Sequence, residues 1–205
     1  MKLKYTVGIL ATAMASSVMA APTEAPSAFV QRVADGLIGR LKADHARLQN
    51  NPTAVNAIVK QNLEPYVDAQ AFTRIVMGTY ASPQNSTPQQ RAAFESNLRQ
   101  SLVQNYGSAL AKYSNQTYSL RPYRPSAGAY QVVTLDFINQ GQKTPVAFQL
   151  ADNNNQWKIR NMNVAGIDLG LQFRNQFAST VQRSGGNLDK AIATFKPDAD
   201  SAVKK

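Results

Sequence analysis

The sequence predicts an α+β fold in which a helical N-terminal half packs on a bent, mainly four-stranded antiparallel sheet. Apolar residues recur about every four positions from Phe29 to Leu110, which is the spacing of one face of a helix. Beyond Tyr113 the apolar residues alternate, and β-branched and aromatic residues become frequent, as in strands. The helical spacing returns after Gly166, so we expect C-terminal helices that close the sheet.

Helical spacing marks three segments before residue 80. Asn51 and Asp68 are expected to cap the second and third helices, because short polar side chains accept hydrogen bonds from the first free backbone N–H groups. Pro52 suits the first position of the second helix, and Gly78 suits the end of the third. The expected buried stripes are Phe29, Val33, Leu37 and Leu41, then Val55, Ile58, Val59 and Leu63, then Phe72, Ile75 and Val76.

The longest helix is expected to begin at Thr87. Thr87 is a favoured cap, Pro88 suits the first helical position, and Gln90 can bond back to the backbone of the cap. Apolar residues then repeat at helical spacing over about four turns. They are Phe94, Leu98, Leu102, Tyr106 and Leu110.

Four strands are expected in residues 117–121, 130–138, 146–150 and 157–164. The turn-forming segments 139–141 and 152–155 separate the last three, so these strands should follow one another as an antiparallel meander. In the last strand the apolar alternation slips between Ile159 and Met162. One extra residue near Asn161 explains this slip, and a bulge there would bend the sheet.

Residues 157–177 contain Trp157, the only Trp of the chain, and join a strand pattern to a helix pattern at Ala165-Gly166. The final long helix is expected over 167–183. Gly185-Gly186 separates it from a short helix over 188–195. One short run thus presents two apolar surfaces, which suits the wall of an apolar cavity.

Residues 1–20 have the features of a secretory signal peptide. Lys2 and Lys4 precede an apolar run, and Val18-Met19-Ala20 resembles a cleavage site, so we expect cleavage after Ala20. Residues 21–195 then form a single domain, with a flexible leader up to Pro26 and a flexible C-terminal tail over 196–205. No later run approaches the roughly 20 apolar residues that span a bilayer, so the exported product should be soluble.

The chain is basic, with a formal net charge of +10, and loss of Lys2 and Lys4 with the signal peptide leaves +8. For an exported protein this charge favours anionic membrane surfaces, phosphate head groups or acidic proteins as partners, and not nucleic acid. The alternative is a basic surface that only keeps the protein soluble. The chain contains no Cys, so the fold relies on its core without disulfides.

The sequence predicts no catalytic residue, no metal site and no cofactor. His45 is the only histidine, and without Cys or a second His a transition-metal site is not expected. The carboxylates are spaced singly, and no nucleophile elbow or Gly-rich phosphate loop is found. The residues therefore give no positive sign of an enzyme, although two of the carboxylates could still meet in space as an acid–base pair.

Several landmarks together resemble the periplasmic phospholipid-binding component of the Mla system, also called the toluene-tolerance family. In chain order they are Leu63-Glu64-Pro65-Tyr66-Val67-Asp68, Met77-Gly78-Thr79-Tyr80, Thr87-Pro88-Gln89-Gln90-Arg91, Trp157-Lys158-Ile159, Val164-Ala165-Gly166-Ile167 and Phe173-Arg174-Asn175-Gln176-Phe177. The chain departs from the family pattern at three places. Ala81 stands where Trp is common, Ala165 where Glu is common, and Arg160-Asn161 where Tyr-Asp is common. These departures put local contacts such as partner docking in doubt, but not a cavity.

The resemblance implies a non-enzymatic, monomeric carrier in the periplasm of a Gram-negative cell. Such a carrier has a mixed α/β fold and binds diacyl phospholipid in a deep apolar cavity. A cone shape like that of NTF2-like proteins is one form that this fold can take. It moves lipid between an outer-membrane lipoprotein and porin complex and an inner-membrane ABC-type transporter complex, which maintains outer-membrane lipid asymmetry. Residues 21–195 are then a lipid-binding domain.

A carrier must hide acyl chains from water. At about 0.8 kcal/mol per methylene, exposing two long chains would cost more than about 20 kcal/mol, so many apolar side chains must line the cavity. Each candidate taken singly is equally well explained by core packing. The candidate lining residues are Val76, Phe94, Leu98, Val133, Leu135, Phe137, Phe148, Leu150, Val164, Leu169 and Phe173.

Four basic residues are candidates for the cavity mouth, where they would meet the phosphate head group: Arg74, Lys143, Arg160 and Arg174. Arg174 lies between Phe173 and Phe177 and matches the family motif. An ion pair of Arg174 with Asp168 is the structural alternative.

Two other functions remain open at this stage. One is an enzyme on a similar cone-shaped fold that acts on a small hydrophobic substrate and uses Asp136 with Tyr106 or Tyr130. The other is an envelope interaction module with a filled core, whose basic face docks on other proteins without any ligand.

Overall fold

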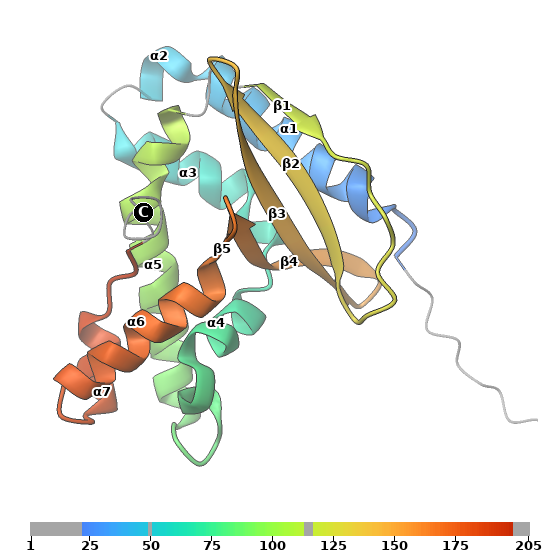
Figure 1. Ribbon diagram of the computed structural model, residues 1–205. Coiled ribbons are helices and arrows are strands. Elements are labelled where there is room, and N and C mark those ends of the chain that lie inside the picture. The colour runs from blue at the N-terminus through green and yellow to red at the C-terminus, as the bar shows by residue number, and fades with distance from the viewer. Residues whose placement is uncertain (1–21, 49–50, 113–116, 199–205) are drawn as a thin grey trace, which may run out of the picture.

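The computed structural model describes residues 22–48, 51–112 and 117–198, with residues 106–112 described as backbone only. The predicted signal peptide, the side chains of Tyr106 and Leu110, and most of the predicted tail lie outside this description. Figure 1 shows helices on one side of the molecule and a twisted sheet on the other. The predicted α+β architecture is confirmed.

The helices of the N-terminal half are α1 (Pro26–Ala43), α2 (His45–Leu48), α3 (Pro52–Asn62), α4 (Ala69–Met77) and α5 (Pro88–Lys112), with short 3₁₀ turns η1 (Glu64–Tyr66) and η2 (Gly78–Ala81). The predicted caps are confirmed. Asn51 accepts from the N–H of Ala54 at 3.0 Å, and Asp68 accepts from that of Ala71 at 2.9 Å. Thr87 and Gln90 bond to each other's backbone N–H groups at 3.1 and 2.9 Å, which completes the capping box.

The predicted flexible leader before Pro26 is wrong for the described residues 22–25. The carboxylate of Glu24 forms an ion pair with Arg32 at 2.8 Å, and the indole N–H of Trp157 donates to the backbone carbonyl of Glu24 at 2.7 Å. The ion pair ties the leader to α1, and the bond from Trp157 ties it to the sheet. A pattern search misses the bond from Trp157 because the two residues are far apart in the chain.

The sheet contains β1 (Thr117–Leu120), β2 (Gln131–Asn139), β3 (Gln142–Asn153), β4 (Gln156–Val164) and β5 (Ile167–Asp168), each antiparallel to the next in the order β1-β2-β3-β4-β5. The meander is confirmed, but β3 is longer than predicted and β5 was not predicted. Each of the last three connections is a two-residue turn with positive φ at both positions, the geometry that joins twisted strands closely. The third of these turns, Ala165-Gly166, folds the chain back and creates β5.

The predicted bulge is confirmed. Gln149 pairs with Asn161 and Leu150 pairs with Ile159, so Arg160 is the extra residue of β4. The insertion explains why the apolar alternation slips in this strand.

The closing helices are α6 (Leu169–Arg183) and α7 (Leu188–Thr194). The first begins two residues later than predicted, because Asp168 caps it by accepting from the N–H of Leu171 at 2.8 Å. Helix α6 packs on α4, on α7 and on β4. A Cβ on Gly170 would lie 2.5 Å from the side chain of Ile75 and 2.9 Å from that of Asn161, so this close approach requires glycine.

The buried apolar residues form three clusters. The helical cluster joins α4 to α7 and consists of Val76, Met77, Phe94, Leu98, Phe173, Phe177, Val181, Ala191, Ile192 and Phe195. The sheet cluster joins α1 to the sheet and consists of Phe29, Val30, Val33, Ala34, Ile38, Val133, Leu135, Leu150 and Ile159. The third cluster lies mainly between α1 and α3 and includes Leu37, Leu41, Val55 and Ile58.

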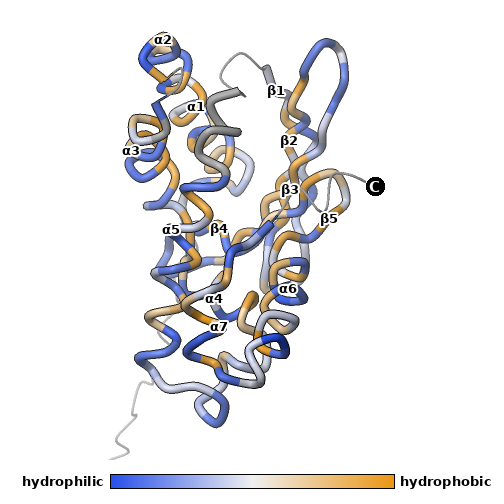
Figure 2. The backbone as a smooth tube through the Cα atoms, turned by 90° about the vertical axis from the view of Figure 1, so that its left-hand side faces the viewer, coloured by the Kyte–Doolittle hydropathy of each residue, from blue (hydrophilic) through white to orange (hydrophobic). Residues whose placement is uncertain are grey.

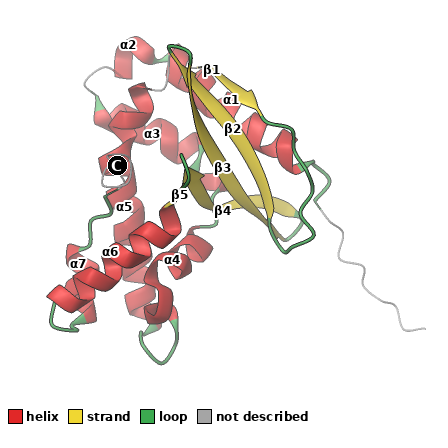
Figure 3. Ribbon diagram, viewed as in Figure 1, coloured by secondary structure: helices red, strands yellow, loops and turns green. Residues whose placement is uncertain are grey.

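The views agree on how these layers are arranged. Figure 3 shows α1 running along the strands and the other helices gathered on one side. In Figure 2, α2, α3 and α5 lie along one side and β1 to β3 along the other, while α4, α6 and α7 close one end. Helix α5 packs on α3, α4 and α7, whereas α1 covers part of β2.

Candidate functional site

The structure places the eleven candidate lining residues on two separate surfaces. Five belong to the helical cluster or pack against it: Val76, Phe94, Leu98, Leu169 and Phe173. Six lie on the sheet: Val133, Leu135, Phe137, Phe148, Leu150 and Val164. The sequence pattern did not separate the two groups, because a helix stripe and one face of a strand are both simply apolar.

The six sheet residues share one face, which we call the inner sheet face. Alternate residues of a strand point to the same side, and residues in register across strands are neighbours. Leu135 lies opposite Val146, which lies opposite Val164. In the adjacent row Val133 lies opposite Phe148, which lies opposite Met162.

Burial differs along the inner sheet face. Leu135 and Leu150 are fully buried and belong to the cluster under α1. By contrast, four neighbouring apolar residues are only half-buried, and we call them the half-buried apolar strip: Phe137, Val146, Phe148 and Val164. Val146 was not among the candidates, although its place opposite both Leu135 and Val164 puts it within the strip.

Four of the five helical residues are buried in dense aromatic packing, whereas Leu169 is only partly buried. The ring of Phe94 lies 4.4 Å from that of Phe177 and 5.5 Å from that of Phe195, and the rings of Phe72 and Phe173 meet edge to face at 6.3 Å. Phe94 and Val76 have no exposed surface. This environment favours core packing for the helical group.

The four candidate head-group residues do not share one location. Arg74 on α4 and Arg174 on α6 are exposed, and the side-chain stem of Arg174 lies against Gly78 at the end of α4. Lys143 pairs in register with Ile138 and therefore lies on the sheet face opposite the half-buried apolar strip. The ion pair of Arg174 with Asp168 is absent from the described residues, where Asp168 instead binds the Asn161 amide and caps α6.

Arg160 stands apart because it is the bulge residue. Its guanidinium lies 3.9 Å from the centre of the Tyr130 ring, a cation–π contact. Its Nε atom is buried and has no hydrogen-bond partner among the described residues.

The geometry does not favour the enzyme alternative. Asp136 lies on the sheet face opposite Leu135 and binds Arg121, whose guanidinium lies 2.7 Å from a carboxylate oxygen. The hydrogen bonds from Arg121 lower the pKa of Asp136, whereas a general acid needs a raised one. The side chain of Tyr106 lies outside the described residues, and the ring face of Tyr130 is in contact with the guanidinium of Arg160.

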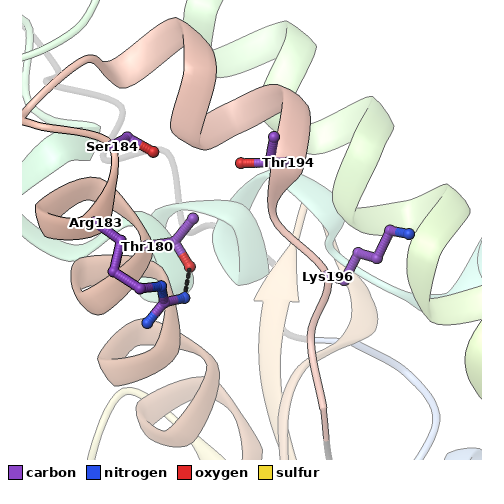
Figure 4. Close-up of a pocket in the computed structure, with 5 residues that line it drawn as sticks. All are labelled: Thr180, Arg183, Ser184, Thr194 and Lys196. Atoms are coloured by element: carbon purple, nitrogen blue, oxygen red, sulfur yellow. Dashed lines mark hydrogen bonds between the residues drawn. The ribbon is translucent and has the colours of Figure 1, made fainter.

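A hollow of about 380 Å³ lies between the ends of α6 and α7 and is lined by Thr180, Arg183, Ser184, Thr194 and Lys196. Figure 4 shows Arg183 donating to the hydroxyl of Thr180, at 2.9 Å. The basic side chains of this hollow, Arg183 and Lys196, lie near the C-terminal ends of α6 and α7. Cations at these positions complement the negative ends of the helix dipoles. We interpret this hollow as structural.

A second hollow of about 410 Å³ lies between α1 and β1. Neither hollow is the deep apolar cavity that the resemblance implies, and this cavity stays a prediction. In the described parts of the chain, no cluster of three or more potential metal ligands occurs and no helix is long and apolar enough to cross a membrane.

Comparison with known proteins gives consistent matches. Residues 31–196 match the family model described as MlaC protein. The toluene tolerance protein ttg2D of Pseudomonas putida is 34% identical over 206 residues, which cover 97% of this chain and 95% of that protein. The intermembrane phospholipid transport system binding protein MlaC of Haemophilus influenzae is 23% identical over 183 residues, covering 87% of this chain and 84% of that protein.

A solved structure has a similar fold. It is the phospholipid-binding protein from Ralstonia solanacearum in complex with a phospholipid. Its TM-score is 0.74 at 26% sequence identity, and the match covers 83% of this chain and 98% of that one.

Proposed function

This chain belongs to the MlaC family, and from that premise we propose that it is an intermembrane phospholipid carrier that holds acyl chains against the inner sheet face. The family resemblance predicted from the sequence is confirmed. So is the prediction of a binding protein without enzymatic activity, since the family is one of lipid-binding carriers.

The observation that carries the proposal is the half-buried apolar strip in a fold whose Ralstonia solanacearum relative holds a phospholipid. Fully buried side chains already have protein partners, as in the helical cluster. Phe137, Val146, Phe148 and Val164 retain exposed apolar surface that an acyl chain can cover. Covering apolar surface contributes roughly 25 cal/mol per Å², so an extended chain along several such residues is held firmly.

The head group should stay near solvent. Arg74 and Arg174 are the stronger candidates for meeting phosphate, because both are exposed and the packing of α6 on α4 brings their elements together. Lys143 is the weakest, because its strand position directs it to the opposite sheet face. An arginine can bind phosphate through two parallel hydrogen bonds.

The wider role follows from the family. We infer that the protein acts as a monomer in the periplasm after cleavage behind Ala20, and that it exchanges lipid with an outer-membrane complex and an inner-membrane ABC-type transporter complex. The chain has no Gly-rich nucleotide loop, so the energy for directed transport would come from the transporter. This traffic would maintain outer-membrane lipid asymmetry.

Mass spectrometry of organic extracts from the purified protein tests the binding proposal. We expect diacyl phospholipid in the extract, and we expect the delipidated protein to take labelled phospholipid from liposomes. Protein that carries no phospholipid and takes none from liposomes would contradict the proposal. The Asp136→Asn variant should take up as much phospholipid as the unchanged chain. Turnover of a small hydrophobic substrate by the unchanged chain, lost in this variant, would instead favour the enzyme alternative.

A further inference from the structure

In the described parts of the chain, β1 has a strand neighbour on one side only, so it forms an edge of the sheet. Arg121 donates from its backbone N–H to the carbonyl of Thr134 at 3.0 Å, and hydrogen-bonded pairs alternate along an antiparallel ladder. Ser119, opposite Asp136, therefore directs its backbone groups toward β2. The N–H and C=O groups of Tyr118 and Leu120 point away from the sheet, and no described residue bonds to them.

This edge lacks most of the usual protection. Natural edge strands are kept very short or carry charges, prolines or bulges, which prevent another strand from pairing with them. The segment Thr117-Tyr118-Ser119-Leu120 is short, but it carries no charge, proline or bulge, and Pro122 comes only after the strand. Leu120 also leaves 36% of its surface exposed. The edge is therefore competent to pair with another strand.

The hollow of about 410 Å³ lies directly beside this edge. It is lined on one side by Thr117, Tyr118 and Leu120 of β1, and on the other by Gln31, Asp35, Ile38, Gly39 and Lys42 of α1. Gln31, Asp35, Gly39 and Lys42 of α1 lie three or four positions apart and form one stripe of the helix, with Ile38 beside it. The hydroxyl of Tyr118 donates to Asp35 and ties the strand to the helix. Figure 1 shows β1 at the sheet border with α1 beside it.

Gly39 keeps the helix side of the hollow open. A Cβ at this position would meet nothing within 4 Å. Glycine inside a helix costs about 1 kcal/mol relative to alanine, and this loss is offset when the missing side chain lets another backbone approach. Open space next to Gly39 is consistent with such an approach.

We propose that β1 and α1 form a docking groove for an extended segment of a partner protein, which pairs with the free edge of β1 as an added strand. Two donors and two acceptors alternate along Tyr118 and Leu120, and an extended polypeptide backbone is the ligand that matches them. Lys42 forms no ion pair with a described residue, so the segment should carry an acidic side chain facing it. The net charge, which is +8 once Lys2 and Lys4 are removed with the signal peptide, disfavours a second copy of this chain as the occupant. This groove goes beyond lipid carriage and does not depend on it.

Peptide selection on the full chain tests the groove. A phage-displayed library of random dodecapeptides is selected against the protein, and the enriched peptides are measured for affinity and for hydrogen exchange. We expect peptides that slow amide exchange at Tyr118 and Leu120, while the amide of Ser119 is already protected by β2. Gly39→Leu should weaken binding by at least about tenfold, because its side chain fills the hollow.

Gly36→Leu is the matched control. Gly36 lies on the same helix and also faces open space, but it does not line the hollow. This variant should bind the peptides normally, and both variants should retain phospholipid. The proposal is overturned if Gly39→Leu weakens the binding of no selected peptide, or if this substitution removes the bound phospholipid. It is also overturned if the amides of β1 become protected from exchange without peptide, because the chain dimerises.

Discussion

Arg160 shows which features of a single residue can be predicted from the sequence and which cannot. The slip between Ile159 and Met162 predicted an inserted residue, and the register identifies it as Arg160. Its stacking on Tyr130 was not predictable, since the two residues are brought together only by the sheet. The burial of the candidate lining residues was likewise not predictable from the sequence. Alternation placed Val133, Leu135 and Phe137 on one face, but only the three-dimensional packing separates half-buried residues from buried ones.

Phe148 gives a direct test at this scale. Phe148→Arg places a charge on the inner sheet face, where it would have to be buried against acyl chains, at a cost of several kcal/mol. Because Phe148 is half-buried, the variant should stay folded by circular dichroism. We expect its phospholipid content, measured by mass spectrometry, to fall by more than about tenfold.

Gln149→Arg is the control for this substitution. Gln149 follows Phe148 on the same strand and therefore points to the opposite sheet face, with similar burial. Its lipid content should match that of the unchanged protein. Equal loss in both variants, or in neither, would mean that the inner sheet face does not hold the lipid.

The elements themselves were largely predictable where local chemistry decides them. The caps at Asn51 and Asp68 and the capping box at Thr87 depend on neighbouring residues only, and each is confirmed. Strand β5 was missed because Ala165-Gly166 was interpreted as a junction between strand and helix, whereas it is a hairpin turn. The leader was misjudged because apolar spacing reveals neither its hydrogen bond with the distant Trp157 nor its ion pair with Arg32.

Gly170 tests the packing of α6 on its neighbours. Gly170→Ala puts a methyl group 2.5 Å from the side chain of Ile75 and 2.9 Å from that of Asn161, so the helix or these side chains must shift. Overpacking of this kind costs about 1–3 kcal/mol in the free energy of unfolding. Urea denaturation should show a lower midpoint.

Gly36→Ala provides the comparison for Gly170→Ala. Gly36 is also helical, but its Cβ would meet no atom within 4 Å. The substitution should therefore raise the free energy of unfolding by up to about 1 kcal/mol. If both variants were stabilised alike, the close contact of α6 with α4 and β4 would be wrong.

At the scale of the whole molecule, three clusters replace the single cavity wall that the sequence suggested. The helical cluster closes one end with fully buried aromatic rings, and the sheet cluster fixes α1 on β2. The half-buried apolar strip lies on the same sheet face as the sheet cluster, and its Phe137 and Phe148 pack against that cluster. The fold class followed from periodicity, but the division of apolar residues between core and ligand surface depends on how the layers meet.

The central claim is that phospholipid chains lie on the inner sheet face. Cross-linking measures this directly: the full chain is loaded with a phospholipid that carries a photoactivatable group on its acyl chain, irradiated, digested and mapped by mass spectrometry. We predict cross-links concentrated in β2, β3 and β4, at the half-buried apolar strip. Cross-links confined to the helical cluster around Phe94 and Phe173, or to the opposite sheet face, would contradict the claim.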